Sequence, residues 1–267
     1  MSKKMYKHSK RAKYTSNNYS SKSGSNLEPG MKGFLCTFNN REKECIREAY
    51  NVLNKYADEL YGPETLECDL NPEQSESNIE DDLEKELKEL KAKNVKKKRF
   101  QVVKSGAKNV LFVRTTIEDP VTLATLIMNE LKNSKSPQTR FLYRLIPIQV
   151  TCKAYIDDIK NVLKESILGN HFKDNDKSFS IVYNHRNNNH LERDTVIKSV
   201  ADLIEEIPGK HPVNLNNPDI SIVIEIIKNV ALLSIVHNYV DMKKFNLLAY
   251  SSNEANLNDE SCKKEND

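Results

Sequence analysis

Glycine is scarce in this sequence, and the few glycines present are too widely spaced to form a phosphate-binding loop. No Gly-X-Gly triplet occurs. The seven glycines stand at positions 24, 30, 33, 62, 106, 169 and 209. The dinucleotide-binding fingerprint and the Walker A loop both need several glycines, because backbone amides must come close to a phosphate. The sequence therefore argues against a nucleotide-binding enzyme, and more weakly against a transferase that uses acetyl-CoA or S-adenosylmethionine.

Motifs for metal binding and nucleophilic catalysis are also missing. The five cysteines form no Cys-X-X-Cys pair, and His185 and His190 lack the spacing of a four-ligand zinc site. No nucleophile elbow occurs. The most hydrophobic stretch, residues 220–240, is interrupted by polar side chains such as Glu225 and Lys228, which excludes a membrane span. We expect an intracellular protein that is not an enzyme, with no metal, no cofactor and no small-molecule substrate.

Charge is distributed in blocks along the chain. Residues 1–32 hold eight Lys and Arg against one Glu, which indicates a disordered basic arm over residues 1–30. Residues 64–92 hold eleven Asp and Glu against three Lys, and residues 93–108 hold seven Lys and Arg and no acid. We interpret residues 64–108 as a charged insertion and residues 246–267 as a disordered acidic tail. The basic arm is suited to phosphate binding, to nuclear import or simply to solubility.

Hydrophobic periodicity predicts an α+β fold with two units. The first, residues 31–150, is a ferredoxin-like domain with alternating strands and helices, in which Asn39 or Asn40 caps the first helix and Asp119 the second. Its expected strands are 33–38, 109–115 and 144–151, and its expected helices are 41–61 and a segment from Pro120. The proline in the third strand favours an edge position or an irregular crossing.

The second unit, residues 151–245, contains two helices and three strands. The expected helices cover residues 155–168 and 195–207, and the expected strands cover 178–184, 220–227 and 231–240. The last two strands are almost continuously apolar, which is typical of central strands that are covered on both faces.

Basic and amide side chains collect near the ends of these strands. Guanidinium groups bind phosphates in a forked geometry, and amides bind bases or ribose hydroxyls, so this pattern indicates RNA binding. Exposed Arg and Lys are also ordinary on any protein surface, and an interdomain salt bridge is the alternative for the first candidate. The candidates are Arg144, Lys153, Arg186, Asn187, Arg193, Lys198 and Lys210.

Two segments, FSIVYNHRNNNHLERDTVIKSVADLI and HPVNLNNPDISIVIEIIKNVALLSIV, resemble the THUMP domain, an RNA-binding module of tRNA-modifying systems. The earlier segments GFLCTFNNREKECIREAYNVLNKYADELYG, NVLFVRT and TRFLYRLIPIQVTCKA are similar to the companion region of the eukaryotic THUMP-domain-containing tRNA acetylation adaptors. The resemblance implies a ferredoxin-like domain followed by a THUMP domain. It also makes Arg144, Lys153 and Arg186 the leading candidates for RNA contact.

The resemblance further implies a non-catalytic function. Adaptors of this family bind tRNA and enable a separate RNA cytidine acetyltransferase to form N4-acetylcytidine in the D-arm of serine and leucine tRNAs, and THUMP modules recognise the acceptor end. We expect a nuclear protein, with the nucleolus or cytoplasm as alternatives. Because only a short polar tail follows the last expected strand, we expect no fused catalytic domain. The alternatives are a general RNA-binding factor in ribosome biogenesis and the RNA-binding subunit of another tRNA-modifying enzyme.

Overall fold

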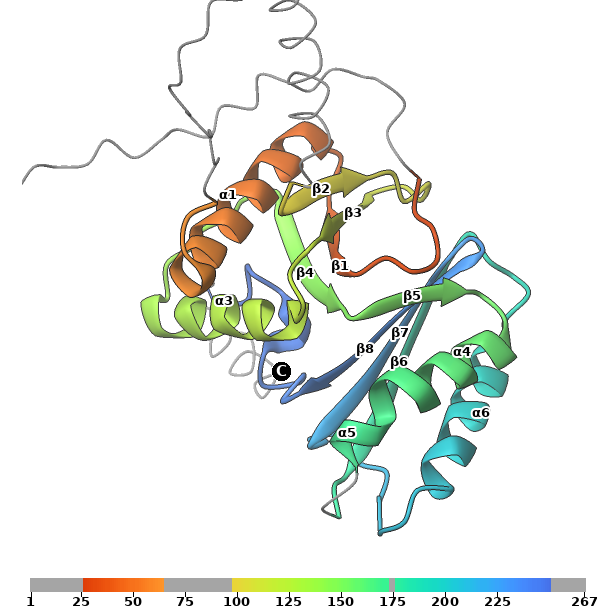
Figure 1. Ribbon diagram of the computed structural model, residues 1–267. Helices are drawn as coiled ribbons and strands as arrows, with labels where there is room; N and C mark the ends of the chain where they lie inside the picture. The colour runs from red at the N-terminus through yellow and green to blue at the C-terminus, as the bar shows by residue number, and fades with distance from the viewer. Residues whose placement is uncertain (1–25, 65–97, 173–175, 251–267) are drawn as a thin grey trace, which may run out of the picture.

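The protein contains two four-stranded sheets that lie between two groups of helices (Figure 1). The computed structural model describes residues 26–64, 98–172 and 176–250. Most of the expected basic arm, the acidic block and the end of the tail lie outside these ranges. Within them, no helix has the length and apolar character that crossing a membrane requires.

The first sheet has the ferredoxin-like arrangement that the sequence predicts. Strands alternate with helices in the order βαββαβ, and the strand order across the sheet is β2-β3-β1-β4, with every neighbouring pair antiparallel. The elements are β1 (Gly33–Phe38), α1 (Glu42–Tyr61), β2 (Phe100–Val103), β3 (Val110–Thr115), α3 (Pro120–Ser134) and β4 (Leu142–Ile148). Strand β4, which contains Pro147, is an edge strand as predicted.

The ends of the helices show one correct and one wrong prediction. Asp119 caps α3, because its Oδ1 accepts a hydrogen bond from the amide of Val121 at 2.9 Å. Neither Asn39 nor Asn40 caps α1; Arg41 holds that position, and its side chain makes no capping hydrogen bond to the backbone of the helix. Asn40 instead adopts a positive φ of 55°, and its amide donates to Oδ1 of Asn109 at 3.3 Å. Its conformation is therefore set by the loop before β3.

Arg99, which follows the charged segment, is hydrogen-bonded to residues that precede it. Its guanidinium group donates to Oδ1 of Asp58 at 2.8 Å and to the carbonyl of Gly62 at 2.9 Å, and its amide donates to Glu64 at 3.0 Å. The chain therefore leaves the end of α1 and returns to the same place. The expected insertion, residues 64–108, nevertheless includes strand β2, which the sequence analysis missed.

The second sheet has the strand order β5-β8-β7-β6, in which only β6 and β7 are parallel. The expected strand 144–151 is divided, because β4 joins the first sheet and β5 joins the second.

The predicted end of the helix 155–168 before Gly169 is wrong, since Gly169 stays helical with φ −57°. The elements are β5 (Val150–Lys153), α4 (Ile156–Val162), the π-helical η1 (Leu163–Leu168), α5 (Gly169–His171), β6 (Phe179–Arg186), α6 (Arg193–Glu205), β7 (Ile220–Ile227), β8 (Val230–His237) and the short η2 (Lys243–Phe245).

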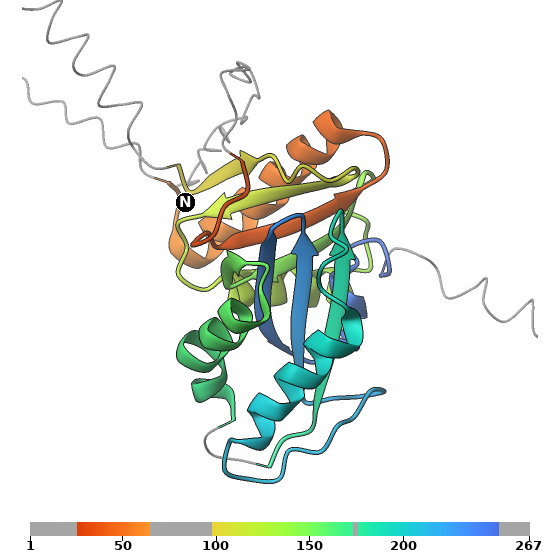
Figure 2. The same ribbon diagram turned by 90° about the vertical axis from the view of Figure 1, so that its right-hand side faces the viewer.

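The two sheets share an apolar interface. Alternate residues of β7 pack beneath α4 and α6, while Val223 and Ile227 on the opposite face join the core of the first sheet, as do Leu232 and Val236 of β8. Both faces of these strands are thus covered, as their apolar sequence predicts. In Figure 2 the strands of the second sheet run at a steep angle to those of the first.

A segment after β8, residues 239–247, returns to the first sheet; we call it the strap. Tyr239, Phe245 and Leu247 are buried in the shared core. The amide of Leu247 donates to the carbonyl of Tyr143 at 2.8 Å, so the strap lies along the free edge of β4. The end of the strap belongs to the expected tail, and Leu27, within the expected arm, is likewise buried. Both segments are therefore shorter than the sequence analysis predicted.

Candidate nucleic-acid interface

Three loops from the two sheets meet at one end of the interface. They are the β2–β3 loop (residues 104–109), the β6–α6 loop (residues 187–190) and the β7–β8 turn (residues 228–229), and together we call them the seam surface. The side-chain amide of Asn187 donates to the carbonyl of Gly106 at 3.3 Å. The side chain of Lys228 passes over Gly106 so closely that a Cβ on this residue would lie 2.4 Å from Nζ. The φ of 73° favours glycine here, while the flexible end of the Lys228 side chain could move aside for a Cβ.

The β6–α6 loop is fixed by Asn188. This side chain is buried; its Nδ2 donates to the carbonyl of Lys228 at 2.7 Å, and its Oδ1 accepts from the amides of His190 and Leu191 at 3.0 and 3.1 Å. A hollow beside it is lined only by amide and imidazole residues. These are His185, Asn187, Asn188, Asn189, His190 and Asn229. Such groups both donate and accept hydrogen bonds, as the edges of bases and ribose hydroxyls require.

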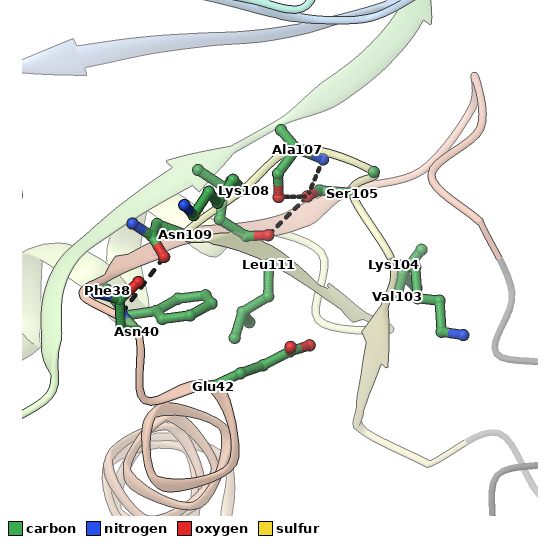
Figure 3. A pocket seen from close by; sticks show the side chains of 12 residues that line it. Phe38, Asn40, Glu42, Val103, Lys104, Ser105, Ala107, Lys108, Asn109 and Leu111 are labelled. Atoms are coloured by element: carbon green, nitrogen blue, oxygen red, sulfur yellow. Dashed lines mark hydrogen bonds between the residues drawn. The ribbon is translucent and has the colours of Figure 1, made fainter.

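The β2–β3 loop adds two cations. Ser105 is buried and closes the loop, because its Oγ donates to the carbonyl of Val110 at 2.6 Å and accepts from the amide of Ala107 at 3.1 Å. Lys104 and Lys108 are exposed beside a second hollow, which also has Glu42 in its lining (Figure 3). Within the described residues neither lysine forms a salt bridge. Both are therefore available to phosphate.

Arg186 connects the seam surface to a buried carboxylate. Its Nη1 donates to Oε2 of Glu225 at 3.2 Å, and Asn184 donates to Oε1 at 2.8 Å. The side chain of Glu225 is 3% exposed and that of Arg186 is 36% exposed. Burial raises the pKa of Glu225, which the hydrogen bond from Asn184 and the charges of Arg186 and Arg144 only partly offset. The carboxylate of Glu225 thus holds one edge of the Arg186 guanidinium group, and the rest of the side chain reaches the surface.

The structure brings four of the predicted contacts to one end of the second sheet. Arg186 ends β6 and Asn187 follows it, and Lys153 ends β5 opposite Val230, the first residue of β8. Arg193 begins α6 and donates to the carbonyl of Tyr183 at 3.3 Å. Lys153, Asn187 and Arg193 are exposed.

Three other predicted contacts lie elsewhere. Lys198 is exposed further along α6. Lys210 lies between α6 and β7, in the segment whose Pro212 carbonyl accepts from the amide of Phe179 at the start of β6, and so at the opposite end of the sheet. Arg144 is half-buried on β4; its charge opposes in part the burial that raises the pKa of Glu225, but among the described residues Glu225 forms its salt bridge with Arg186. The contact role of each candidate stays a prediction.

Sequence reasoning missed Lys104, Lys108 and Lys228. The first two belong to the basic block 93–108, which the sequence pattern places in an insertion; the third stands out in the sequence only as a polar interruption of the hydrophobic stretch 220–240. Of the cations at 96–99, Lys98 is exposed, Arg99 is used in the structural contacts described above, and the other two lie outside the described residues. What could have found Lys228 is the parallel pairing of β6 with β7, which places the β7–β8 turn beside the end of β6. Lys104 and Lys108 reach this surface only through the docking of the two sheets.

Comparison with known proteins agrees with these observations. The family model for the THUMP domain matches residues 153–236. Mouse THUMP domain-containing protein 1 is 42% identical over 227 residues, covering 83% of this chain and 65% of the mouse protein. The Drosophila melanogaster THUMP domain-containing protein 1 homolog is 35% identical over 241 residues, covering 83% of this chain and 74% of that protein.

A protein of Saccharomyces cerevisiae named tRNA acetyltransferase TAN1 is 26% identical over 248 residues, covering 83% of this chain and 85% of the yeast protein. The chain spans slightly less than two thirds of the mouse relative. The similarity therefore extends beyond the THUMP domain into the residues of the first sheet.

Proposed function

Because this chain belongs to the THUMP domain-containing protein 1 family, we propose that it binds tRNA through the seam surface and acts as an adaptor for a separate acetyltransferase. The observation that carries this proposal is the seam surface itself, where both sheets contribute lysines and amide side chains to one end of the molecule, with Arg186 beside them. The name of the yeast relative, tRNA acetyltransferase TAN1, supports both the substrate and the modification.

In the full form of the proposal, the acetyltransferase forms N4-acetylcytidine in the D-arm of serine and leucine tRNAs. The seam surface holds the acceptor end, with phosphates supplying affinity and the unpaired end supplying selection. The chain contributes binding and position, and its partner contributes the chemistry. The scarcity of glycine in the sequence supports this division. Nuclear localisation remains a prediction.

The first experiment is nucleoside mass spectrometry of tRNA and rRNA from cells with and without this gene. We expect N4-acetylcytidine to disappear from tRNA and to persist in rRNA. Wild-type protein and the control variant Lys160→Ala/Lys164→Ala, on the helices covering the second sheet, should restore it. The seam variant Lys104→Ala/Lys108→Ala should restore it only in part, because two phosphate contacts are lost.

Three outcomes would favour other functions. Loss of a different tRNA nucleoside would assign the chain to another modifying enzyme, and unchanged tRNA with defective rRNA processing would assign it to ribosome biogenesis. The purified chain should also be incubated with acetyl-CoA and tRNA. Formation of N4-acetylcytidine without a second protein would make the chain itself the enzyme.

A further inference from the structure

Further positively charged side chains lie beyond the β2–β3 loop of the seam surface. We propose that Arg41 and Arg140 form a second phosphate-binding position for the same RNA, a proposal that rests on the RNA-binding function above. The two residues belong to different elements, since Arg41 precedes α1 and Arg140 precedes β4. Both are exposed, and Arg41 has a side-chain exposure of 63%.

Phe141 brings the two guanidinium groups to one place. The Cζ atom of Arg140 lies 5.5 Å from the centre of this ring, and the Cζ atom of Arg41 lies 5.9 Å from it. An arginine beside an aromatic ring is held by cation–π attraction while its N–H groups remain free at their outer edge. Two guanidinium groups at one ring can each donate a pair of hydrogen bonds to phosphate oxygens.

The loop that carries Arg140 is fixed before any ligand binds. The carboxylate of Glu48 on α1 accepts hydrogen bonds from three consecutive amides, those of Arg140, Phe141 and Leu142, at 3.0, 2.8 and 2.9 Å. In addition, Oγ1 of Thr139 donates to the carbonyl of Leu142 at 2.9 Å. A loop held in this way loses little conformational freedom on binding, so more of the contact energy contributes to affinity.

The arginine pair continues the seam surface along the end of the first sheet. The end of β1 lies next to the loop before β3, because the amide of Phe38 donates to the carbonyl of Asn109 at 3.1 Å. Figure 3 shows Phe38 and Asn40 beside Asn109 and Lys108. On the other side, Phe38 pairs with Leu142 at the start of β4. From β3 across β1 to β4 is two strand spacings, about 10 Å, so one RNA strand can reach both places.

The acidic residues nearby do not cancel this charge. Glu44 is Arg41's carboxylate partner at 3.4 Å, but this ion pair is exposed and such pairs are weak in water. The oxygens of Glu48 already accept three amide hydrogen bonds. Arg140 has no salt bridge within the described part of the chain. Among the described residues, the carboxylate of Glu44 is therefore the only one within salt-bridge distance of either arginine.

The test compares tRNA affinity across a salt series for the wild type and the variant Arg41→Gln/Arg140→Gln. We expect the affinity at low salt to fall on the order of 10- to 100-fold. The slope of log affinity against log salt should become shallower by about 1.5, as expected when two phosphate contacts are lost. Arg47→Gln is the matched control, since it removes one exposed arginine from the same helix. It should leave both quantities close to the wild-type values.

A double variant with the wild-type affinity and slope would overturn the proposal, and so would a control variant that is equally impaired. Modification of arginines by phenylglyoxal in the wild-type protein gives a second measurement that does not depend on a variant folding. Bound tRNA should protect Arg41 and Arg140, and unchanged modification would also overturn the assignment. If the wild-type protein itself does not bind tRNA, the proposed tRNA-binding function is wrong, independently of the role of the two arginines.

Discussion

Arg186 lies between a buried carboxylate and the seam surface, and its side chain has a structural partner as well as an expected ligand. A carboxylate that loses its cation inside a protein leaves an uncompensated buried charge, which destabilises the fold. Glu225 would be left in this state if Arg186 were simply truncated, although Asn184 would still donate to it. Weaker RNA binding by such a variant would therefore have two possible causes, a lost contact or a less stable protein.

A double substitution separates these causes. We expect Arg186→Ala to lower tRNA affinity by about 1 to 3 kcal/mol and the free energy of unfolding by a similar amount. Arg186→Gln/Glu225→Gln removes both charges, so it should recover most of the stability while affinity stays low. Circular dichroism is suitable for the unfolding measurement, because the chain has no tryptophan. Wild-type affinity in the double variant would show that Arg186 does not touch RNA.

The helices and strands were predicted where the apolar pattern is long enough to show its period. The run at 220–227 was predicted at its observed bounds, and α1 within one residue. Strand β2 has only four residues and follows a run of lysines, so no period is visible, and it is an edge strand with less surface to bury. Gly169 looks like a helix end, but the helix continues through it in ordinary helical geometry.

The candidate site was also predictable only in part, because some of its residues lie outside recognisable strands and helices. Arg186 and Asn187 end a recognisable strand, so their place at the edge of a sheet follows from the sequence. Lys104, Lys108 and Lys228 reach the same surface because the β2–β3 loop packs across the interface onto Asn187. That packing depends on how the two sheets dock, which no local pattern reveals.

The contacts of Arg99 lead to a prediction about the charged segment. Because Arg99 holds Asp58, Gly62 and Glu64 together, replacement of residues 65–97 by a short Gly/Ser linker should preserve the fold. We expect the free energy of unfolding to change by less than about 1 kcal/mol, since loop length has only a weak effect on stability. In the same background, Arg99→Ala should be clearly destabilising. A linker variant that fails to fold in thermal denaturation would show that the segment contributes to the core.

For the whole molecule, the important feature is that the two sheets are parts of one folding unit. The hydrophobic core of the first sheet contains side chains from β7, from β8 and from the strap. Neither sheet could bury this surface alone. The seam surface is therefore built on a rigid interface, and its loops are positioned before RNA arrives.

This arrangement predicts a single unfolding transition. Leu232→Ala, at the interface, should lower the free energy of unfolding by about 2 to 5 kcal/mol without splitting the transition. Separate chains of residues 26–148 and 149–250 should each be less stable than the parent and prone to aggregation, because each would expose its half of the interface. Two distinct calorimetric transitions in the intact protein would contradict this prediction and show that the sheets unfold independently.

The strap has a consequence for the protein while it is being made. Strand β4 leaves the ribosome well before residues 239–247, yet these residues cover its free edge through the contact between Leu247 and Tyr143. Translation adds about 5 to 20 residues each second, so the nascent first sheet has an open edge and an uncovered apolar face for several seconds. Open strand edges pair readily with other chains. This chain should therefore depend on chaperones during synthesis, and most strongly in the interval between β4 and the strap.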